Sequence, residues 1–238
     1  MNDNFDFGVF PDPYDLYPDE YGLVALGGRL TPETVCEAYN KGIFPWSGED
    51  PIPWFSPDPR LILIPSEFHR SKSLRKLLKK DTFQIVFDKN FEAIVRACAL
   101  TYRRDQDGTW INGRIPKVYG ELFNRGHAHS VEVYRNGQLV GGLYGLSFGR
   151  AFFGESMFSS EPNTSKLALS ALCSFLVSHD FEFLDCQQET AHLSSLGARS
   201  VSRLDFLARL ESALSKPNLP GPWTNMSPSG VVSSSSDD

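Results

Sequence analysis

The change from helical to strand-like hydrophobic periodicity near residue 129 is the feature that most constrains the fold of this 238-residue chain. Before it, apolar residues recur at helical spacing in the segments 88–100 and 116–125. After it, apolar and polar residues alternate, and the Asn136-Gly137 pair is a strong hairpin signal. We therefore predict an antiparallel meander with strands at 130–135, 139–148 and 151–158.

The meander is followed by a second set of elements. The pattern predicts a helix at 164–179, a strand at 181–187 and a helix that is capped by Ser202 and ends near Leu214. Strands followed by a helix, a strand and a helix are typical of an α+β protein with helices packed on a sheet. The order is also similar to that of GCN5-like N-acyltransferase (GNAT-like) cores.

The N-terminal quarter of the chain has a different character. A short helix is predicted, with Thr31 as its N-cap, Pro32 at its first position and Gly42 at its end. A Pro-rich and aromatic segment follows, with a strand expected at 61–64. We expect an α+β protein in which a small N-terminal α/β domain precedes a GNAT-like domain. The expected divisions are an acidic leader at 1–20, the N-terminal domain at 21–62, the GNAT-like domain at 63–216 and a disordered C-terminal tail at 217–238.

The net charge of −6 is unevenly distributed along the chain. Residues 1–20 hold six acidic residues and no Lys or Arg, so residues 21–238 have no net charge. The negative charge of the whole chain therefore does not exclude a polyanionic partner for residues 21–238. Residues 60–80 are strongly basic, and the amphipathic stretch from Arg70 to Lys80 within them predicts an exposed cationic helix. The basic residues of 60–80 are Arg60, Arg70, Lys72, Arg75, Lys76, Lys79 and Lys80.

Several classes of protein are excluded by motifs that the sequence lacks. It has no P-loop and no G-x-G-x-x-G motif after a strand, so it shows no nucleotide or dinucleotide site. Its four cysteines are widely spaced and suggest neither a disulfide framework nor a zinc site. Neither a long apolar run nor a signal-peptide pattern is present, so we expect a cytoplasmic protein without a membrane span. Because the nucleotide, dinucleotide and zinc motifs are missing, we expect no metal and no cofactor.

Seven ordered motifs occur along the chain: GLVALGG at 22–28, YNKGIFPW at 39–46, WFSPDPR at 54–60, HAH at 127–129, GESMFS at 154–159, LDCQ at 184–187 and SLGA at 195–198. Together, from about residue 21 to about residue 210, they closely resemble those of the leucyl/phenylalanyl-tRNA-protein transferase family. The resemblance implies an N-terminal domain joined to an acyltransferase-like domain, without a metal. It also implies transfer of Leu or Phe, and less well Met, from Leu-tRNA or Phe-tRNA to proteins that begin with Arg or Lys. This reaction creates an N-degron of the N-end rule pathway.

The resemblance also implies roles for individual residues. Trp46 and Trp110 match the tryptophans that contact the tRNA 3′ adenosine, and both lie in loop-like sequence that favours an exposed ring. We expect the phosphates of the tRNA to contact Lys72, Arg75, Lys76 and Lys79. The aminoacyl pocket would be lined by Leu143, Phe152, Met157, Leu169, Leu172 and Leu184. Members of the family can carry Met at position 143 and Phe at position 172, so the preference among Leu, Phe and Met is open.

The chemistry is expected at Glu155, Asp185 and Gln187. Alternation along an extended 183–187 segment places Asp185 and Gln187 on one face and Cys186 on the other. The same alternation places Glu155 and Met157 together, with a carboxylate beside the apolar pocket. Asp185 and Gln187 act either as an acid/base relay or as groups that position the substrates, and the sequence leaves both roles open.

Two other functions fit parts of the sequence. An acetyl-CoA-dependent N-acetyltransferase would use the same kind of sheet, but it requires a Gly-rich pyrophosphate loop, and residues 161–166 contain no glycine. A non-catalytic RNA-binding module would use the basic helix and the tryptophans. The RNA-binding module gives no role to Asp185 and Gln187.

Overall fold

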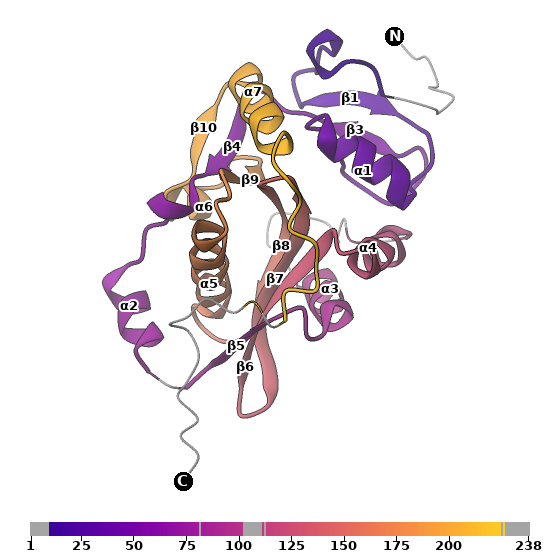
Figure 1. The fold of residues 1–238 in the computed structure, drawn as a ribbon. Helices are drawn as coiled ribbons and strands as arrows, with labels where there is room; N and C mark the ends of the chain where they lie inside the picture. Colours follow the sequence, from indigo (N-terminus) through magenta and orange to yellow (C-terminus); the bar gives the residue numbers. More distant parts are fainter. Residues whose placement is uncertain (1–9, 81, 102–110, 112, 225, 227–238) are drawn as a thin grey trace.

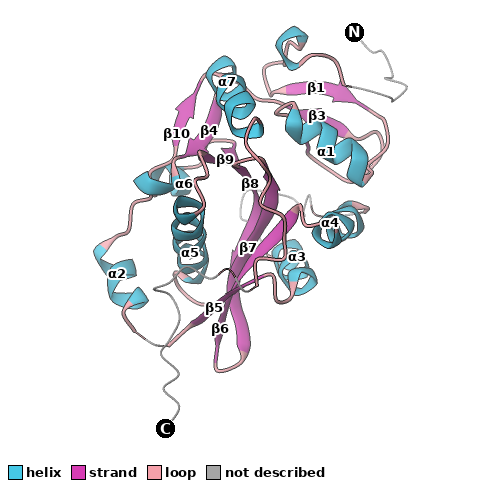
Figure 2. Cartoon of the chain, in the orientation of Figure 1, coloured by secondary structure: helices cyan, strands magenta, loops and turns pink. Residues whose placement is uncertain are grey.

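The computed structural model describes residues 10–80, 82–101, 111, 113–224 and 226 (Figure 1). Its strands, magenta in Figure 2, form two sheets. The small sheet has the order β1 (Leu23–Leu26), β3 (Pro53–Phe55) and β2 (Phe44–Pro45). The large sheet has the order β10 (Arg199–Val201), β4 (Arg60–Leu63), β9 (Phe183–Gln187), β8 (Ala151–Ser159), β7 (Gln138–Phe148), β6 (Ala128–Arg135) and β5 (Gln84–Phe87).

Helices cover both faces of the large sheet. Helix α5 packs on one face, against β6, β7 and β8, while α3 and α4 pack on the opposite face (Figure 1). Two buried apolar clusters correspond to these two layers. The helices are α1 (Pro32–Asn40), α2 (Lys72–Leu78), α3 (Phe91–Leu100), α4 (Ile115–Asn124), α5 (Thr164–Ser178), α6 (Ala191–Ser195) and α7 (Arg203–Leu214). The mixed α+β class predicted from the sequence is therefore confirmed.

The predicted meander is present as β6, β7 and β8, which pair antiparallel in sequence order. Asn136 and Gly137 have φ values of 51° and 76°, and these two left-handed residues form the tight turn between β6 and β7. The bounds of α5, α7 and β4 also agree closely with the sequence-based expectation. Local turn and capping signals were sufficient to locate these elements.

Strands β1, β2, β3, β5 and β10 and helix α6 were not predicted. The helix expected from residue 88 begins at Phe91, because Asn90 is its N-cap and its side chain accepts a hydrogen bond from the Ala93 N–H. Asp88 has a positive φ of 54° and separates this helix from β5. The boundary expected between residues 62 and 63 falls inside β4, which pairs with β9 and β10 in the large sheet.

The parallel pair formed by β8 and β9 differs from the rest of the large sheet. The two strands pair only where residues 151–153 face residues 183–185. Beyond Phe153, β8 continues to Ser159 paired with β7 alone, so β8 and β9 separate. An opening in the sheet is therefore framed by β8 on one side and β9 on the other.

The C-terminal segment 217–224 is packed, so the expectation that disorder begins at residue 217 is wrong for this part. Trp223 is fully buried, and its ring stacks on His129 with centroids 3.5 Å apart. Its backbone N–H donates to Asp88 Oδ2 over 2.7 Å, and the same carboxylate contacts His129 Nδ1 over 2.9 Å. Residues 227–238 lie outside the described part of the chain.

We predict that Trp223→Ala lowers the free energy of unfolding by about 3–5 kcal/mol, because it empties a large buried volume beside Phe175. Urea denaturation of the full chain measures this change. Leu204→Ala, at a side chain that is 62% exposed, is the control and should change the free energy by less than about 0.5 kcal/mol. Equal effects of the two substitutions would show that the C-terminal segment does not contribute to the core.

Candidate active site

A pocket of about 660 Å³ lies where β8 and β9 separate. Its walls come from β7, β8, β9 and α5 of the large sheet layer, from α6, and from the segment 44–46 of the N-terminal part. The volume is in the range of sites for small ligands. Segments distant in sequence therefore meet at the opening in the sheet.

The apolar part of the pocket contains most of the residues expected there. The structure brings together Leu143, Met157, Leu169, Leu172 and Leu184. Phe152 does not line the pocket, because its ring is fully buried in the core on the α5 side, near Trp223. Five of the six residues expected in the apolar wall therefore line this cavity, and Phe152 does not.

A β-bulge in β8 determines the direction of the Glu155 side chain. Gly145 faces Gly154 and Tyr144 faces Ser156, so Glu155 is the extra residue of the bulge. The bulge interrupts the alternation along β8. The carboxylate of Glu155 reaches tyrosines on the α4 side, while Met157 packs on the α5 side. The predicted common face of Glu155 and Met157 is wrong, but both residues line the pocket because it lies at the opening of the sheet.

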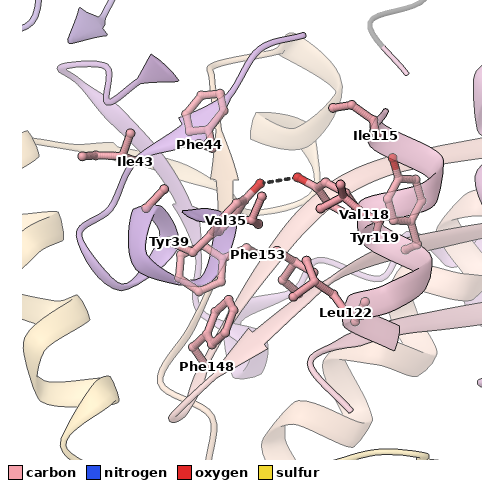
Figure 3. Packing of buried hydrophobic residues seen from close by; sticks show 14 of the residues in the cluster. Val35, Tyr39, Ile43, Phe44, Ile115, Val118, Tyr119, Leu122, Phe148 and Phe153 are labelled. Carbon is pink, nitrogen blue, oxygen red and sulfur yellow. Dashed lines mark hydrogen bonds between the residues drawn. The ribbon is translucent and has the colours of Figure 1, made fainter. Parts of the chain in front are cut away.

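Two buried tyrosines hold the Glu155 carboxylate. Tyr39 from α1 donates to Oε1 over 2.7 Å, and Tyr119 from α4 donates to Oε2 over 3.2 Å. The two tyrosine hydroxyls are themselves 2.9 Å apart, and Figure 3 shows this contact as a dashed line between α1 and α4. Gln187 Nε2 also donates to Glu155 Oε1, over 3.3 Å. Elements from both parts of the chain therefore orient one carboxylate at the pocket.

Burial raises the pKa of Glu155 from 4.5 to about 7, and the nearby Asp185 adds to this shift. The hydrogen bonds from Tyr39 and Tyr119 and the charge of Arg60 act in the opposite direction. Burial also raises the pKa of both tyrosines well above 10, so they stay protonated and donate. Glu155 can therefore gain or lose a proton near neutral pH, as a general acid or base requires.

Asp185 and Gln187 do not share a face, contrary to the prediction. Leu184 and Cys186 line the pocket, whereas Asp185 is fully buried on the other side of β9. Gln187 has a φ of 65°, which breaks the alternation at the end of the strand and returns its side chain to the pocket. Asp185 Oδ1 accepts a hydrogen bond from the Gln187 backbone N–H over 2.9 Å, and no bond joins the two side chains.

The Asp185 carboxylate is bound by Arg60, a residue that we did not identify as part of the site. Arg60 Nε donates to Oδ1 over 2.9 Å, and Nη2 donates to Oδ2 over 2.7 Å. Tyr39 and Tyr119 were also missed. Tyr39 and Arg60 are the terminal residues of the motifs at 39–46 and 54–60, so the sequence contained a signal for them. Tyr119 lies in none of these motifs, and the sequence shows only that it is on the buried side of a helix.

Trp46 is half-buried and lines the pocket beside Phe55, with ring centroids 5.2 Å apart. Trp110 lies outside the described residues. Trp54, in contrast, is fully buried, and its indole N–H donates to the Gly27 carbonyl. The structure therefore distinguishes one tryptophan at the pocket from one in the core.

The basic stretch divides into inward and outward residues. Arg60 is buried, and Arg70 donates to the hydroxyls of Ser170 and Ser174 on α5. The cationic residues expected to contact phosphate are exposed along α2 and at its end: Lys72, Arg75, Lys76 and Lys79. Helix α2 lies outside α5 (Figure 2).

The described part of the chain contains no group of three or more His, Cys, Asp or Glu that could hold a metal ion. None of the helices in this part is long and apolar enough to cross a membrane.

Comparison with known proteins gives a consistent result over most of the chain. Residues 62–211 match the family model of leucyl/phenylalanyl-tRNA protein transferase, and residues 28–58 match the model of its N-terminal domain. A leucyl/phenylalanyl-tRNA–protein transferase of Desulfatibacillum aliphaticivorans is 49% identical over 224 residues, which cover 94% of this chain and 95% of the relative. The transferase of that name from Thiobacillus denitrificans is 48% identical, with 90% and 94% covered.

We predict that Glu155→Gln removes a pH-dependent loss of stability. Because the folded protein holds a proton on Glu155 that the unfolded chain releases, wild-type stability falls as pH rises from 4.5 to about 7. The free energy of unfolding of the variant relative to wild type should rise across this window, by up to about 3 kcal/mol, and then level off. Urea denaturation below, within and above the window measures it. Glu189→Gln, at an exposed position, controls for loss of a charge, and a flat difference for Glu155→Gln would contradict the prediction.

Proposed function

The chain belongs to the leucyl/phenylalanyl-tRNA–protein transferase family, and from this premise we propose how it carries an aminoacyl group from tRNA to protein. The aminoacyl group is Leu or Phe, and less well Met, and the acceptor is the N-terminal amine of a protein that begins with Arg or Lys. The product carries an N-degron of the N-end rule pathway, in the cytoplasm. The observation that carries the proposal is the Glu155 carboxylate, with a pKa of about 7, beside an apolar pocket.

The side-chain pocket supports an apolar aminoacyl group. Leucine, phenylalanine and methionine side chains are uncharged, and burying them against Leu143, Leu169 and Leu172 removes apolar surface from water. Met157 on β8 and Leu184 on β9 complete this wall. A charged side chain would lose its hydration there without gaining a partner from these five residues.

The polar edge of the same pocket supports amide formation. An aminoacyl ester is already activated, so attack by the acceptor α-amine forms the amide and releases the tRNA hydroxyl without ATP. In our proposal Glu155 accepts the proton that the amine loses as the carbon–nitrogen bond forms. Gln187, whose amide lies 3.3 Å from Glu155, orients the amine or the ester carbonyl. The proton then passes to the ribose oxygen as the carbon–oxygen bond breaks, which balances the reaction.

We assign the 3′ adenosine to Trp46, and to Trp110 from the family motif alone. Stacking of a base on an aromatic ring contributes about 1–3 kcal/mol, and Trp46 lies at the pocket where the ester must be placed. We assign tRNA phosphates to the exposed cations of α2. The body of the tRNA would then extend from the pocket across α5 towards α2.

We interpret the large sheet as GNAT-like because a parallel pair opens after three residues and a helix, α5, connects its strands. We keep the division into an N-terminal domain and an aminoacyltransferase domain as a proposal, with β4 placed in the second. An acetyl-CoA-dependent enzyme is less well supported. The turn before α5 contains Glu161 and Pro162 and no glycine, and an acid there repels a pyrophosphate.

The transfer reaction can be tested directly. With radiolabelled Leu-tRNA we expect label on a peptide that begins with Arg and none on the same peptide beginning with Asp. Incubation with labelled acetyl-CoA in place of the tRNA should label neither peptide. Label on neither peptide from Leu-tRNA would overturn the proposed function, and binding of tRNA without transfer would favour the RNA-binding module.

The basic helix can be tested separately through the salt dependence of the reaction. Neutralising Lys72 and Lys76 with Gln should raise KM for aminoacyl-tRNA and make the negative slope of log(1/KM) against log salt shallower, by about one per lost phosphate contact. A matched double variant at the exposed cations Lys117 on α4 and Arg209 on α7 should leave the slope unchanged. Equal slopes for the two double variants would contradict the assignment of tRNA phosphates to α2.

A further inference from the structure

The contacts behind the pocket single out one buried residue that does not touch it. We infer that Arg60 is a positioning residue of the transfer reaction: it fixes Asp185, which fixes the Gln187 backbone and so sets the Gln187 amide against Glu155. The inference rests on the proposed function, and it gives Asp185 a positioning role in place of a proton-transfer role.

Hydrogen bonds and aromatic rings fix the orientation of the Arg60 guanidinium. Its side chain is 1% exposed and forms a two-point contact with Asp185 at 2.9 and 2.7 Å. Nη1 donates to the Gly42 carbonyl over 3.2 Å. The guanidinium lies over the rings of Phe44 and Phe206, at 4.8 and 4.4 Å from their centroids. A planar, two-point donor of this kind fixes the plane of the carboxylate, which a lysine ammonium does not.

Asp185 transmits this orientation to the main chain. Its Oδ1 accepts from both Arg60 Nε and the Gln187 N–H, each over 2.9 Å. Gln187 has a φ of 65°, a left-handed conformation that residues with a Cβ rarely adopt without a local partner. The hydrogen bond from its N–H to Asp185 is such a partner. With that bond in place, the Gln187 side chain turns to the pocket and its amide donates to Glu155.

Asp185 itself is poorly placed to exchange protons with a substrate. It is fully buried, it is absent from the pocket wall, and both of its carboxylate oxygens already accept hydrogen bonds from Arg60. Gly42 and Phe44, which contact Arg60, lie in the segment that leads to Trp46 at the pocket. Arg60 therefore connects the β9 end of the site to the segment that carries Trp46.

A double-mutant cycle tests this arrangement in the full chain. Arg60→Lys keeps the charge but not the two-point geometry, and we expect kcat to fall about 100-fold, as displacement of a positioned group by about 1 Å does, with KM for aminoacyl-tRNA little changed. In a Gln187→Ala background the same substitution should lower kcat no further, because the group that it positions is gone. Its effect on the urea midpoint should be the same in both backgrounds.

The control is Arg203→Lys, at another buried arginine, which donates to Ser56 Oγ and the Pro13 carbonyl and does not contact Asp185. It should lower stability and leave kcat unchanged. If Arg60→Lys does not fold, Asp185→Asn replaces it in the cycle with the same expectation. The inference is overturned if Arg60→Lys and Arg203→Lys lower kcat by the same factor. It is also overturned if the fall in kcat of the Arg60→Lys, Gln187→Ala double variant is the product of the falls in the two single variants.

Failure of the proposed function would be seen separately, as a lack of transfer by the wild-type protein. The positioning role is then judged from the nitrogen-15 NMR signal of the Gln187 side-chain amide. This signal should shift in Arg60→Lys and stay in place in Arg203→Lys. An unchanged signal in Arg60→Lys would overturn the inference whether or not transfer occurs.

Discussion

The buried ion pair between Arg60 and Asp185 is the interaction on which the rest of the site depends. Removing two charges from water costs several kcal/mol per ion, and only close two-point geometry with further hydrogen bonds offsets that cost. The pair meets this condition because Gly42 and Gln187 supply the additional hydrogen bonds. The ion pair lies where β4 pairs with β9, so loss of the ion pair would disturb the sheet and the pocket together.

Two irregularities in the sheet create the pocket and aim its polar groups. β8 and β9 separate after three paired residues, which exposes both strand edges to a ligand. At the same point the bulge at Glu155 and the left-handed Gln187 each bring a polar side chain to that opening. In a regular sheet, alternation would place Glu155 beside Met157 on the α5 side, away from Tyr39 and Tyr119. It would also place Gln187 beside the buried Asp185, away from the pocket. Both departures from regular backbone occur at the proposed reacting centre, as is common at functional sites.

Most of the fold and part of the site could be predicted from the sequence. The meander, α5 and α7 followed from local signals such as Asn136-Gly137 and the Ser202 cap, because neighbouring residues determine those features. The bulge at Glu155 and the direction of Asp185 could not, because they depend on partners such as Arg60 and Tyr39 that lie more than 100 residues away. Five of the six residues predicted for the apolar pocket line the cavity. Phe152 lies on the same α5 side as these residues but packs beside Trp223, because alternation gives the face of a residue and not which part of that face borders a cavity.

The packing of Trp223 has a consequence for how the chain is made. This side chain fills the layer between the sheet and α5, beside Phe175 and Phe181, and its N–H is bound by Asp88 from the β5 end of the sheet. Every strand of both sheets precedes it in the sequence. During synthesis the sheet therefore leaves the ribosome before the residue that completes its core. A chain interrupted just after α7 would contain all the groups of the pocket and still expose an unfilled apolar cavity to chaperones and proteases.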